Sequence, residues 1–236
     1  MLGLLGGMSW TSTAEYYRLL NTLYAERRGG LHSAPLLLHS VDFAEVAAMQ
    51  QAGDWDGAGQ LLAGAARGLE QAGAGAILLA TNTMHRVAGH IEQAVNIPLL
   101  HIVDGTAQAI RAAGIDRVGL VATAFTMEQE FYTGRLRDKF GIKVLVPGDE
   151  DRQEVHRIIY DELCRNDVRP ESRETYRGVL AKLVERGGQG VILGCTEITL
   201  LVGPKDTTVP VFDTTWLHAL AATDWLLDTT AYTDSD

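Results

Sequence analysis

The sequence predicts an α/β fold made of two pseudo-symmetric lobes, each built around a parallel sheet. Two observations support this prediction. Short apolar runs alternate with longer segments of helical periodicity, which is the pattern of βα units around parallel strands. In addition, three pieces of the first half of the chain recur in the second half in the same order.

The expected strands are short runs rich in leucine, isoleucine and valine. In chain order they are Leu2 to Leu5, Ala34 to Ser40, Ala76 to Ala80, Leu99 to His101, Arg117 to Ala122, Lys143 to Val146, Gly190 to Gly194 and Val209 to Phe212. Segments of helical periodicity fill the intervals. They are Thr11 to Arg28, Phe43 to Gln50, Trp55 to Ala72, Met84 to Ala94, Gly105 to Ala113, Glu128 to Phe140, Arg152 to Asn166, Pro170 to Arg186 and Thr214 to Asp228.

The internal repeat aligns three strand-containing pieces at a nearly constant spacing close to half the chain length. "LGLLGG" matches "VGLVAT", "ILLATNT" matches "VILGCTE", and "IPLLHIVD" matches "VPVFDTTW", which places Gly3 over Gly119, Thr81 over Cys195 and Pro98 over Pro210. We therefore expect two Rossmann-like lobes, one formed by residues 1–97 with 210–236 and the other by residues 98–209, with the active site in the cleft between them. The polar tail "DTTAYTDSD" is expected to fray.

Charge and composition exclude several classes of protein. The net charge of -10 and the lack of a basic run argue against a nucleic-acid partner. No segment approaches the roughly 18 apolar residues of a membrane span, and the N-terminus lacks the positive region of a signal peptide. We expect a cytoplasmic protein that does not bind membranes and whose two cysteines are thiols.

Small and hydroxyl-bearing residues follow four of the expected strands, where parallel sheets collect ligands. The four junctions are Gly6 to Ser9, Thr81 to Thr83, Thr123 to Thr126 and Cys195 to Glu197. Cys195 is expected in the first turn of a helix, whose dipole would lower the thiol pKa from about 8.5 toward neutrality. Cys195 is then either a base or nucleophile, or a small buried residue under a helix. Cys164 is expected in the hydrophobic core.

Several motifs together resemble the aspartate/glutamate racemase family. They are "GLLGGMSW" at the start, "TNTMH" at Thr81 to His85 and "GCTEI" at Gly194 to Ile198, with further similarity at Gly29 to Phe43 and Phe125 to Leu136. The resemblance implies a cofactor-independent enzyme with two pseudo-symmetric lobes, in which two cysteines face each other across the α-carbon of the substrate. It also implies a homodimer, since related racemases commonly pair.

This chain departs from the family pattern at the first cysteine, where Thr81 stands, whereas the second falls on Cys195. The resemblance narrows to a branch with threonine at this position, which is linked to L-aspartate and L-glutamate. We expect racemisation of an acidic amino acid in which Cys195 removes the α-proton and Thr81 reprotonates the other face. Because a hydroxyl is a weaker base than a thiolate, the reverse reaction should have the lower kcat/KM.

The expected substrate-binding residues surround these two groups. Asn82, Thr83 and Thr196, with their backbone N–H groups, would either stabilise the α-carboxylate or simply cap helices. Glu197 would either pair with the substrate ammonium or cap a helix. The resemblance adds Met8 and Gln50, which match positions that touch substrate in the family. In the second lobe, Thr123 and Thr126 are candidates for binding the distal carboxylate of the substrate. His85 would orient Thr81, relay a proton, or simply pack.

No cofactor is expected. The histidines show no spacing typical of zinc, and no "GxGxxG" motif is present. The four lysines lie in polar or helical contexts away from the four strand-end motifs, which argues against pyridoxal phosphate. Two alternatives to the racemase remain open. One is an enzyme similar to arylmalonate decarboxylase that uses Cys195 alone as the proton donor, and the other is a non-catalytic amino-acid-binding protein.

Overall fold

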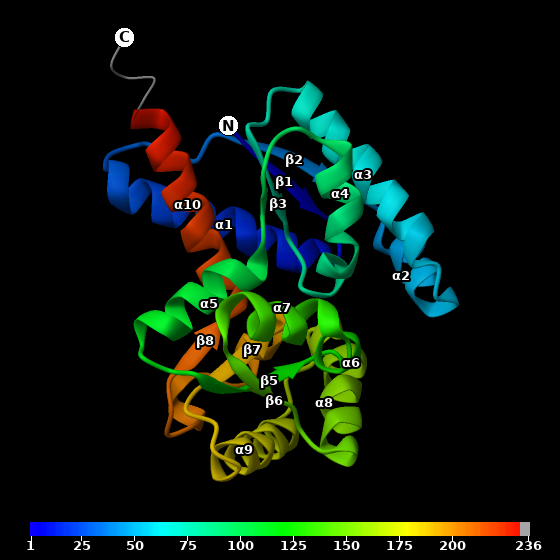
Figure 1. Ribbon diagram of the computed structural model, residues 1–236, viewed down its shortest axis with the longest axis vertical. Helices are drawn as coiled ribbons and strands as arrows, with labels where there is room; N and C mark the ends of the chain where they lie inside the picture. The colour runs from blue at the N-terminus through cyan, green and yellow to red at the C-terminus, as the bar shows by residue number, and fades with distance from the viewer. Residues whose placement is uncertain (232–236) are drawn as a thin grey trace. The chain divides into compact units, whose positions relative to one another are not determined.

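The computed structural model describes residues 1–231 and divides the chain into two compact units. Unit 1 comprises Met1–His101 and the segment from His218 onward, and unit 2 comprises Ile102–Leu217. Each unit contains one four-stranded sheet whose neighbouring strands all run parallel (Figure 1). The predicted α/β class is therefore confirmed. The predicted fraying of the polar tail falls largely outside the described residues.

The sheet of unit 1 has the strand order β2-β1-β3-β4. Its strands are β1 (Leu2–Gly6), β2 (Leu36–Ser40), β3 (Ala76–Leu79) and β4 (Leu99–Leu100). The helices of this unit are α1 (Trp10–Arg28), α2 (Phe43–Ala52), α3 (Trp55–Gln71), the 3-10 helix η1 (Thr83–Val87), α4 (Ala88–Ala94) and most of α10 (Thr214–Ala231).

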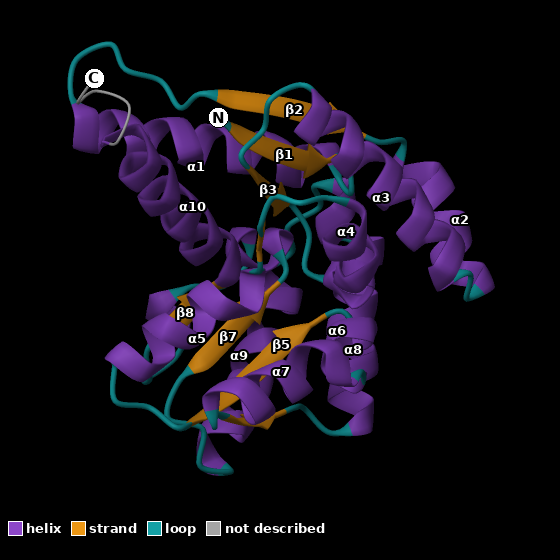
Figure 2. Cartoon of the chain, turned by 45° about the horizontal axis from the view of Figure 1, so that its top comes forward, coloured by secondary structure: helices purple, strands orange, loops and turns teal. Residues whose placement is uncertain are grey.

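Alternation along the strands gives unit 1 two hydrophobic cores, one on each face of its sheet. Leu4 and Leu78 point toward the core that includes residues of α1 and α10, whereas Leu5 and Leu79 point toward the core that includes α2, α3 and α4. Figure 2 shows helices on both faces of this sheet. The loops that follow β1 and β3 lie beyond the carboxyl ends of these parallel strands, at one edge of the sheet.

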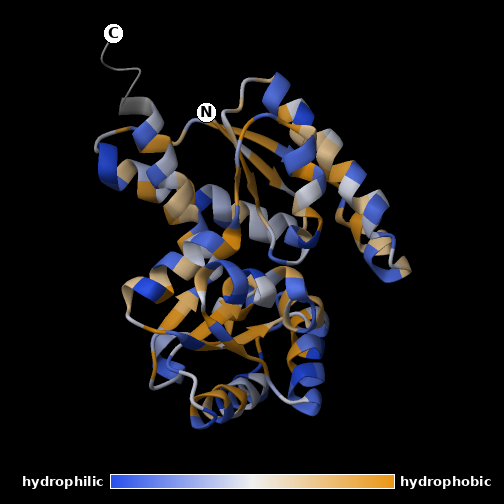
Figure 3. Ribbon diagram, viewed as in Figure 1, coloured by the Kyte–Doolittle hydropathy of each residue, from blue (hydrophilic) through white to orange (hydrophobic). Residues whose placement is uncertain are grey.

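The sheet of unit 2 has the corresponding order β6-β5-β7-β8. Its strands are β5 (Arg117–Ala122), β6 (Lys143–Leu145), β7 (Val191–Gly194) and β8 (Val211–Asp213). Its helices are α5 (Ile102–Ala112), α6 (Ala124–Glu128), α7 (Glu130–Phe140), α8 (Asp149–Asp161), α9 (Pro170–Glu185) and the 3-10 turns η2 (Leu163–Arg165), η3 (Thr196–Leu200) and η4 (Pro204–Asp206). Figure 3 shows hydrophobic strands covered by helices of mixed polarity.

The internal repeat is confirmed at the level of single hydrogen bonds. Gly3 pairs with Ile77 in unit 1, and Gly119 pairs with Val191 in unit 2, as the sequence alignment of the repeats requires. The N–H of Ile77 donates to the carbonyl of Pro98 at 2.8 Å, and the N–H of Val191 donates to the carbonyl of Pro210 at 2.9 Å. Thr81 and Cys195 therefore occupy equivalent positions, each directly beyond the second central strand of its own sheet.

The unit boundaries differ from the expected ones because the last strand of each repeat belongs to its own sheet. β4 pairs with β3, and β8 pairs with β7, so the chain leaves each sheet after these strands and not before them. The crossings lie at 101–102 and 217–218, in place of the expected 97–98 and 209–210. The helix that follows the last strand of each repeat belongs to the other unit. After β4 of unit 1, α5 lies in unit 2, and after β8 of unit 2, most of α10 lies in unit 1.

Three expected helices are divided in the structure. The segment expected as Met84 to Ala94 is η1 followed by α4, the helix expected from Glu128 is preceded by α6, and the helix expected to reach Asn166 ends at Asp161 before η2. This last break corrects the prediction for Cys164. Its side chain is exposed, because the chain has left the helical path on which its predicted core position depends.

A buried carboxylate anchors η4 to α9 within unit 2. The Asp206 side chain is only 1% exposed and accepts hydrogen bonds from Arg173, Arg177 and the N–H of Gly203. Arg173 is the largest cause of a pKa for Asp206 well below its usual value, although burial acts in the opposite direction. The ionised carboxylate therefore stabilises the folded state.

We predict that a methyl group at either repeat-equivalent glycine destabilises the protein. A Cβ at Gly3 would lie 3.2 Å from the Cβ of Leu69, and one at Gly119 would lie 3.1 Å from the Cβ of Leu183. Each substitution to alanine should lower the free energy of unfolding by about 1–3 kcal/mol through overpacking, measured by urea denaturation.

Glycines on the covering helices are matched controls for this prediction. Gly68 in α3 and Gly178 in α9 have open space where a Cβ would stand. Their replacement by alanine should leave stability unchanged or raise it by up to about 1 kcal/mol, since alanine favours helix. Equal effects at strand and helix glycines would contradict the proposed close packing.

We also predict that Asp206→Asn weakens the fold in a pH-dependent way. Loss of a charged acceptor should lower the free energy of unfolding by about 1.5–3 kcal/mol at pH 7. Because the native pKa is depressed, this contribution is present above the unfolded pKa of about 3.9 and disappears as pH falls through the native value. The deficit should therefore shrink in acid denaturation curves below about pH 4. Asp167→Asn, which removes an exposed ion pair with Arg169, is the control and should cost under about 1 kcal/mol.

Candidate active site

The predicted site residues of unit 1 gather beyond two neighbouring strands. Met8 follows β1 and is buried, whereas Thr81, Asn82 and Thr83 follow β3, with Thr81 half-buried and the other two buried. Because β1 and β3 pair in parallel, their carboxyl ends meet at the same edge of the sheet. The structure thus brings this predicted set together.

The loop before Met8 has a backbone that only glycine suits. Gly7 has a φ of 99°, and a Cβ there would lie 2.2 Å from the carbonyl oxygen of Val41. The hydroxyl of Thr13 in α1 accepts from the N–H of Gly7 at 2.8 Å and donates to the carbonyl of Ser9. These bonds hold the β1–α1 loop close to the end of β1, and the Met8–Ser9 peptide within it is cis.

Gln50 joins the site from the end of α2. Its side chain is buried, and its amide nitrogen lies 2.9 Å from the sulfur of Met84, the residue after Thr83. Met8 and Met84 belong to the same hydrophobic core. Gln50 therefore contacts the segment that follows Thr81, and Met8 packs in the same core as that segment.

Thr81 is held through its backbone. Its N–H donates to the carbonyl of Leu79 at 2.9 Å, and its own carbonyl lies 2.7 Å from Nδ1 of His85. Asn82 precedes η1, and its carbonyl accepts from the N–H of His85 at 3.1 Å. The Thr81 turn is thus a short 3-10 segment, in place of the first turn of the α-helix that the sequence predicts.

In unit 2, Thr123 and Thr126 form one turn beyond β5. Both side chains are buried, their hydroxyl oxygens lie 3.2 Å apart, and the Thr123 carbonyl accepts from the N–H of Thr126 at 3.0 Å. Cys195, Thr196 and Glu197 follow β7, which pairs with β5. The two groups therefore lie at the same edge of the second sheet.

Cys195 and Glu197 form a thiol–carboxylate pair. The half-buried Cys195 donates from Sγ to Oε2 of Glu197 at 2.9 Å. Thr196, between them, points elsewhere, because its hydroxyl lies 3.0 Å from the hydroxyl of Thr215. Glu197 is thus an acceptor for the cysteine in this structure, and η3 has no side-chain cap.

The expected lowering of the Cys195 pKa is wrong. Burial, followed by the negative charge of Glu197, raises the pKa of this thiol well above its ordinary value. No α-helix follows Cys195, only the five-residue 3-10 turn η3, so little dipole is available to favour a thiolate. In its resting state Cys195 is therefore a protonated thiol.

Two residues of α8 contact this edge and were not predicted. Nδ1 of His156 accepts from the N–H of Ala124 at 3.1 Å, and the rings of His156 and Tyr160 lie 4.7 Å apart. Burial lowers the pKa of His156. Burial also raises the pKa of Tyr160 to about 12, and the nearby Cys195 contributes to this rise. Both groups are neutral near pH 7. Their spacing of four residues, which places them on one face of a helix, was the feature of the sequence that could have identified them together.

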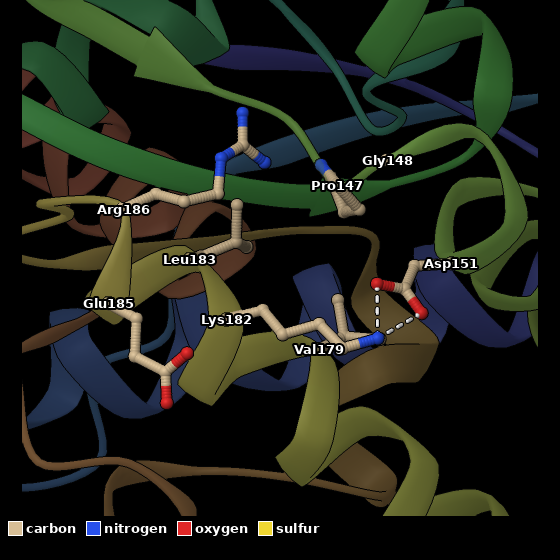
Figure 4. A pocket seen from close by; sticks show the side chains of 8 residues that line it. All are labelled: Pro147, Gly148, Asp151, Val179, Lys182, Leu183, Glu185 and Arg186. Atoms are coloured by element: carbon tan, nitrogen blue, oxygen red, sulfur yellow. Dashed lines mark hydrogen bonds and ion pairs between the residues drawn. The ribbon is translucent and has the colours of Figure 1, made fainter.

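A separate cavity of about 320 Å³ lies between α8 and α9 in unit 2 (Figure 4). Its lining residues include none of the predicted site residues, and both of its cationic side chains have partners. Lys182 lies 2.9 Å from both carboxylate oxygens of Asp151, and Arg186 donates to the carbonyl of Val146 at 2.7 Å. We therefore place the candidate site at the strand ends.

Two kinds of feature are absent from residues 1–231. No helix in this part of the chain is long and apolar enough to cross a membrane. Within the same residues, no cluster of three or more His, Cys, Asp and Glu side chains is arranged to hold a metal ion.

Comparison with known proteins identifies similar chains. A family model described as "Asp/Glu/Hydantoin racemase" matches residues 5–222. A solved structure from Yersinia pestis, described as a candidate Asp/Glu racemase, is 55% identical with a TM-score of 0.92, covering 96% of this chain and 98% of that chain. An aspartate racemase homologue from Pyrococcus horikoshii is 33% identical with a TM-score of 0.82, covering 98% of both chains.

Other similarities are more distant. Picrophilus torridus aspartate racemase is 20% identical with a TM-score of 0.73, covering 98% of this chain and 94% of that chain, and therefore shows the shared fold alone. An uncharacterised protein of Pectobacterium carotovorum subsp. carotovorum is 29% identical over 140 residues, which is 59% of this chain and 87% of that protein.

We predict that Glu197→Gln makes Cys195 more reactive. Removal of the adjacent negative charge should lower the pKa of the thiol, and the pH profile of its alkylation by iodoacetamide should move to lower pH. The measurement uses a Cys164→Ser background so that a single thiol reacts. An unchanged profile would mean that Glu197 has no electrostatic influence on Cys195.

Proposed function

The chain belongs to the Asp/Glu/Hydantoin racemase family, and we propose that it racemises an acidic amino acid with Cys195 and Thr81 moving the α-proton. Amino-acid racemisation without pyridoxal phosphate is the activity of this family, so the chain is an isomerase of this type. The proposal concerns the substrate class and the residues that act on it.

The equivalence of Thr81 and Cys195 in the two repeats is the observation that supports the proposal best. Each follows the central strand that pairs with the first strand of its repeat, in the same register. Racemisation requires a proton to leave one face of the α-carbon and another to arrive on the opposite face. Two equivalent positions, one from each repeat, suit a reaction with that symmetry.

The first step begins from the protonated thiol of Cys195. Its proton passes to Oε2 of Glu197, which already accepts the Sγ hydrogen bond at 2.9 Å, and a thiolate remains. The thiolate then removes the α-proton of the substrate and becomes a thiol again. The electron pair of the broken C–H bond stays on the substrate as a carbanion stabilised by its carboxylate.

Thr81 completes the reaction from the other face. Its hydroxyl donates a proton to the carbanion, and the resulting alkoxide takes a proton from solvent. Glu197 releases to solvent the proton that it received from Cys195, so that all three side chains return to their starting protonation states. A hydroxyl readily donates a proton to a carbanion but is a poor base. The reverse reaction, in which Thr81 would have to remove the α-proton, therefore has the less favourable first step. The enantiomer whose α-proton faces Cys195 should therefore have the higher kcat/KM.

Hydrogen-bond donors at the two turns would bind the substrate and stabilise the developing negative charge. Asn82 and Thr83 at the first turn and Thr196 at the second are assigned to the α-carboxylate. Thr123 and Thr126, buried together beyond β5, are assigned to the distal carboxylate. Met8 and Gln50 complete the site by fixing the first turn.

An acidic substrate is supported by the similarity to the aspartate racemase homologue from Pyrococcus horikoshii, which is 33% identical over 98% of both chains. The proposal also includes two features expected from the sequence, a cytoplasmic location and a homodimer. The oligomeric state can be measured by light scattering after size-exclusion chromatography.

We predict that the enzyme incorporates deuterium at the α-carbon of L-aspartate or L-glutamate in heavy water and accumulates the D-enantiomer. Proton NMR follows the exchange, and chiral chromatography follows the product. Recovery of both amino acids unlabelled after long incubation would argue against the proposed substrate class. Turnover of an arylmalonate instead would favour the decarboxylase alternative.

Substitutions separate the two roles. Cys195→Ala should abolish turnover while binding of the amino acid, measured by calorimetry, persists. Thr81→Ala should block formation of the D-enantiomer by at least about 100-fold, within the range of a lost acid–base group, and Thr81→Ser is the control that retains a hydroxyl. Binding without any turnover in the wild type would favour the binding-protein alternative.

A further inference from the structure

Three buried histidines of unit 1 form a cluster next to the Thr81 turn. His85, His101 and His218 are 2%, 7% and 1% exposed. The ring of His85 lies 4.5 Å from that of His101 and 5.7 Å from that of His218, measured between centroids. We call these three residues the histidine cluster, and the mechanism above uses none of them.

The partners of two of the rings determine where their protons lie. Nδ1 of His85 lies 2.7 Å from the carbonyl oxygen of Thr81, and because a carbonyl can only accept, Nδ1 carries the hydrogen. Nε2 of His218 lies 2.7 Å from the carbonyl oxygen of Leu100 and is likewise the donor. Nδ1 of a neutral His218 then accepts from the hydroxyl of Tyr16 at 2.9 Å. The two rings thus adopt opposite tautomers.

The cluster links the Thr81 turn to both places where the chain crosses between units. His101 is the last residue of unit 1 before the first crossing, and His218 is the first residue after the second. Both rings pack against His85, so the side chain that bonds the Thr81 carbonyl is held by residues from both crossings. The Thr81 N–H is fixed independently by Leu79.

The second repeat lacks this device. The position equivalent to His85 is Thr199, which is exposed and donates to the carbonyl of Thr196 at 2.7 Å. The carbonyl of Cys195 accepts instead from the backbone N–H of Ile198 at 3.2 Å. A buried imidazole is therefore used only for the repeat that carries threonine.

We propose that His85 is a positioning residue that fixes Thr81 for proton donation through its Nδ1–H bond to the Thr81 carbonyl. This inference rests on the proposed role of Thr81. A hydroxyl that must deliver a proton to one side of a carbon gains more from accurate placement than from any shift in its own acidity. Misplacement by about 1 Å can cost about 100-fold in rate.

Two near-isosteric substitutions test the proposal. The side-chain amide nitrogen introduced by His85→Asn can stand where Nδ1 stands, whereas the amide introduced by His85→Gln reaches only the position of Nε2. We expect His85→Asn to retain kcat within about 10-fold and His85→Gln to lose about 100-fold in kcat with little change in KM. Equal kcat values for the two variants would overturn the proposal, whatever their common value.

A double-mutant cycle distinguishes positioning from general packing. In a Thr81→Ala background, His85→Gln should cause no further loss in formation of the D-enantiomer, because the residue it positions is gone. An additive loss would assign His85 to the scaffold and overturn the proposal. The thermal midpoints of the His85→Asn and His85→Gln variants are measured in parallel and should agree.

A spectroscopic readout keeps this inference separate from the proposed function. Nitrogen-15 NMR of histidine-labelled protein should show His85 as the Nδ1–H tautomer and His218 as the Nε2–H tautomer at neutral pH, with assignment by the His85→Asn variant. An Nε2–H tautomer or an imidazolium at His85 would overturn the proposal even in an active enzyme. Absence of racemisation together with the expected tautomers would reject the role of Thr81 and leave the hydrogen bond established.

Discussion

Parallel pairing of two central strands in one register determines where Thr81 and Cys195 lie in the two sheets. Gly3 beside Ile77 and Gly119 beside Val191 set the ends of β3 and β7 at matching heights in their sheets. The residues that follow must turn at the carboxyl edge, where backbone N–H groups and short polar side chains gather. Thr81 and Cys195 owe their equivalence to this register, which a shift of one residue would abolish.

The two equivalent positions differ in how the protein controls them. At Cys195 the control is electrostatic, since burial and the negative charge of Glu197 favour the protonated thiol. At Thr81 the control is geometric, since the backbone is fixed on both sides by Leu79 and His85. The surroundings of a thiol can shift its pKa into a useful range, whereas a hydroxyl is too weakly acidic for such a shift. The protein can therefore influence the hydroxyl of Thr81 mainly through its position.

Most of the fold could be predicted from the sequence because the periodicity of apolar residues is a local property of each segment. The internal repeat of strand-containing pieces pointed to the same elements. The sequence placed Thr81 and Cys195 at strand ends correctly because those ends are defined by the strands themselves. Its errors concern features set by tertiary contacts. The pKa of Cys195 depends on burial and on the rotamer of Glu197, and the exposure of Cys164 depends on where α8 ends.

Residues that approach the site from a distance were the hardest to predict. His156 and Tyr160 lie on α8, far in sequence from Ala124 and Cys195 of the same unit, and approach them only once that helix packs against its sheet. The unit boundaries were misplaced for a related reason. The strand pattern of the sequence identifies β4 and β8. These strands have only two and three residues, and tertiary packing determines which sheet each one joins.

The return of α10 to unit 1 has a consequence for synthesis on the ribosome. Unit 2 is one continuous stretch, Ile102–Leu217, and its whole core emerges in a single interval. Unit 1 begins first but lacks Ala219, Ala222 and Leu226, which belong to the core on one face of its sheet, until the segment that follows unit 2 has been made. Domains made first usually fold first during synthesis, but the core of unit 1 is complete only after the whole of unit 2 has been made.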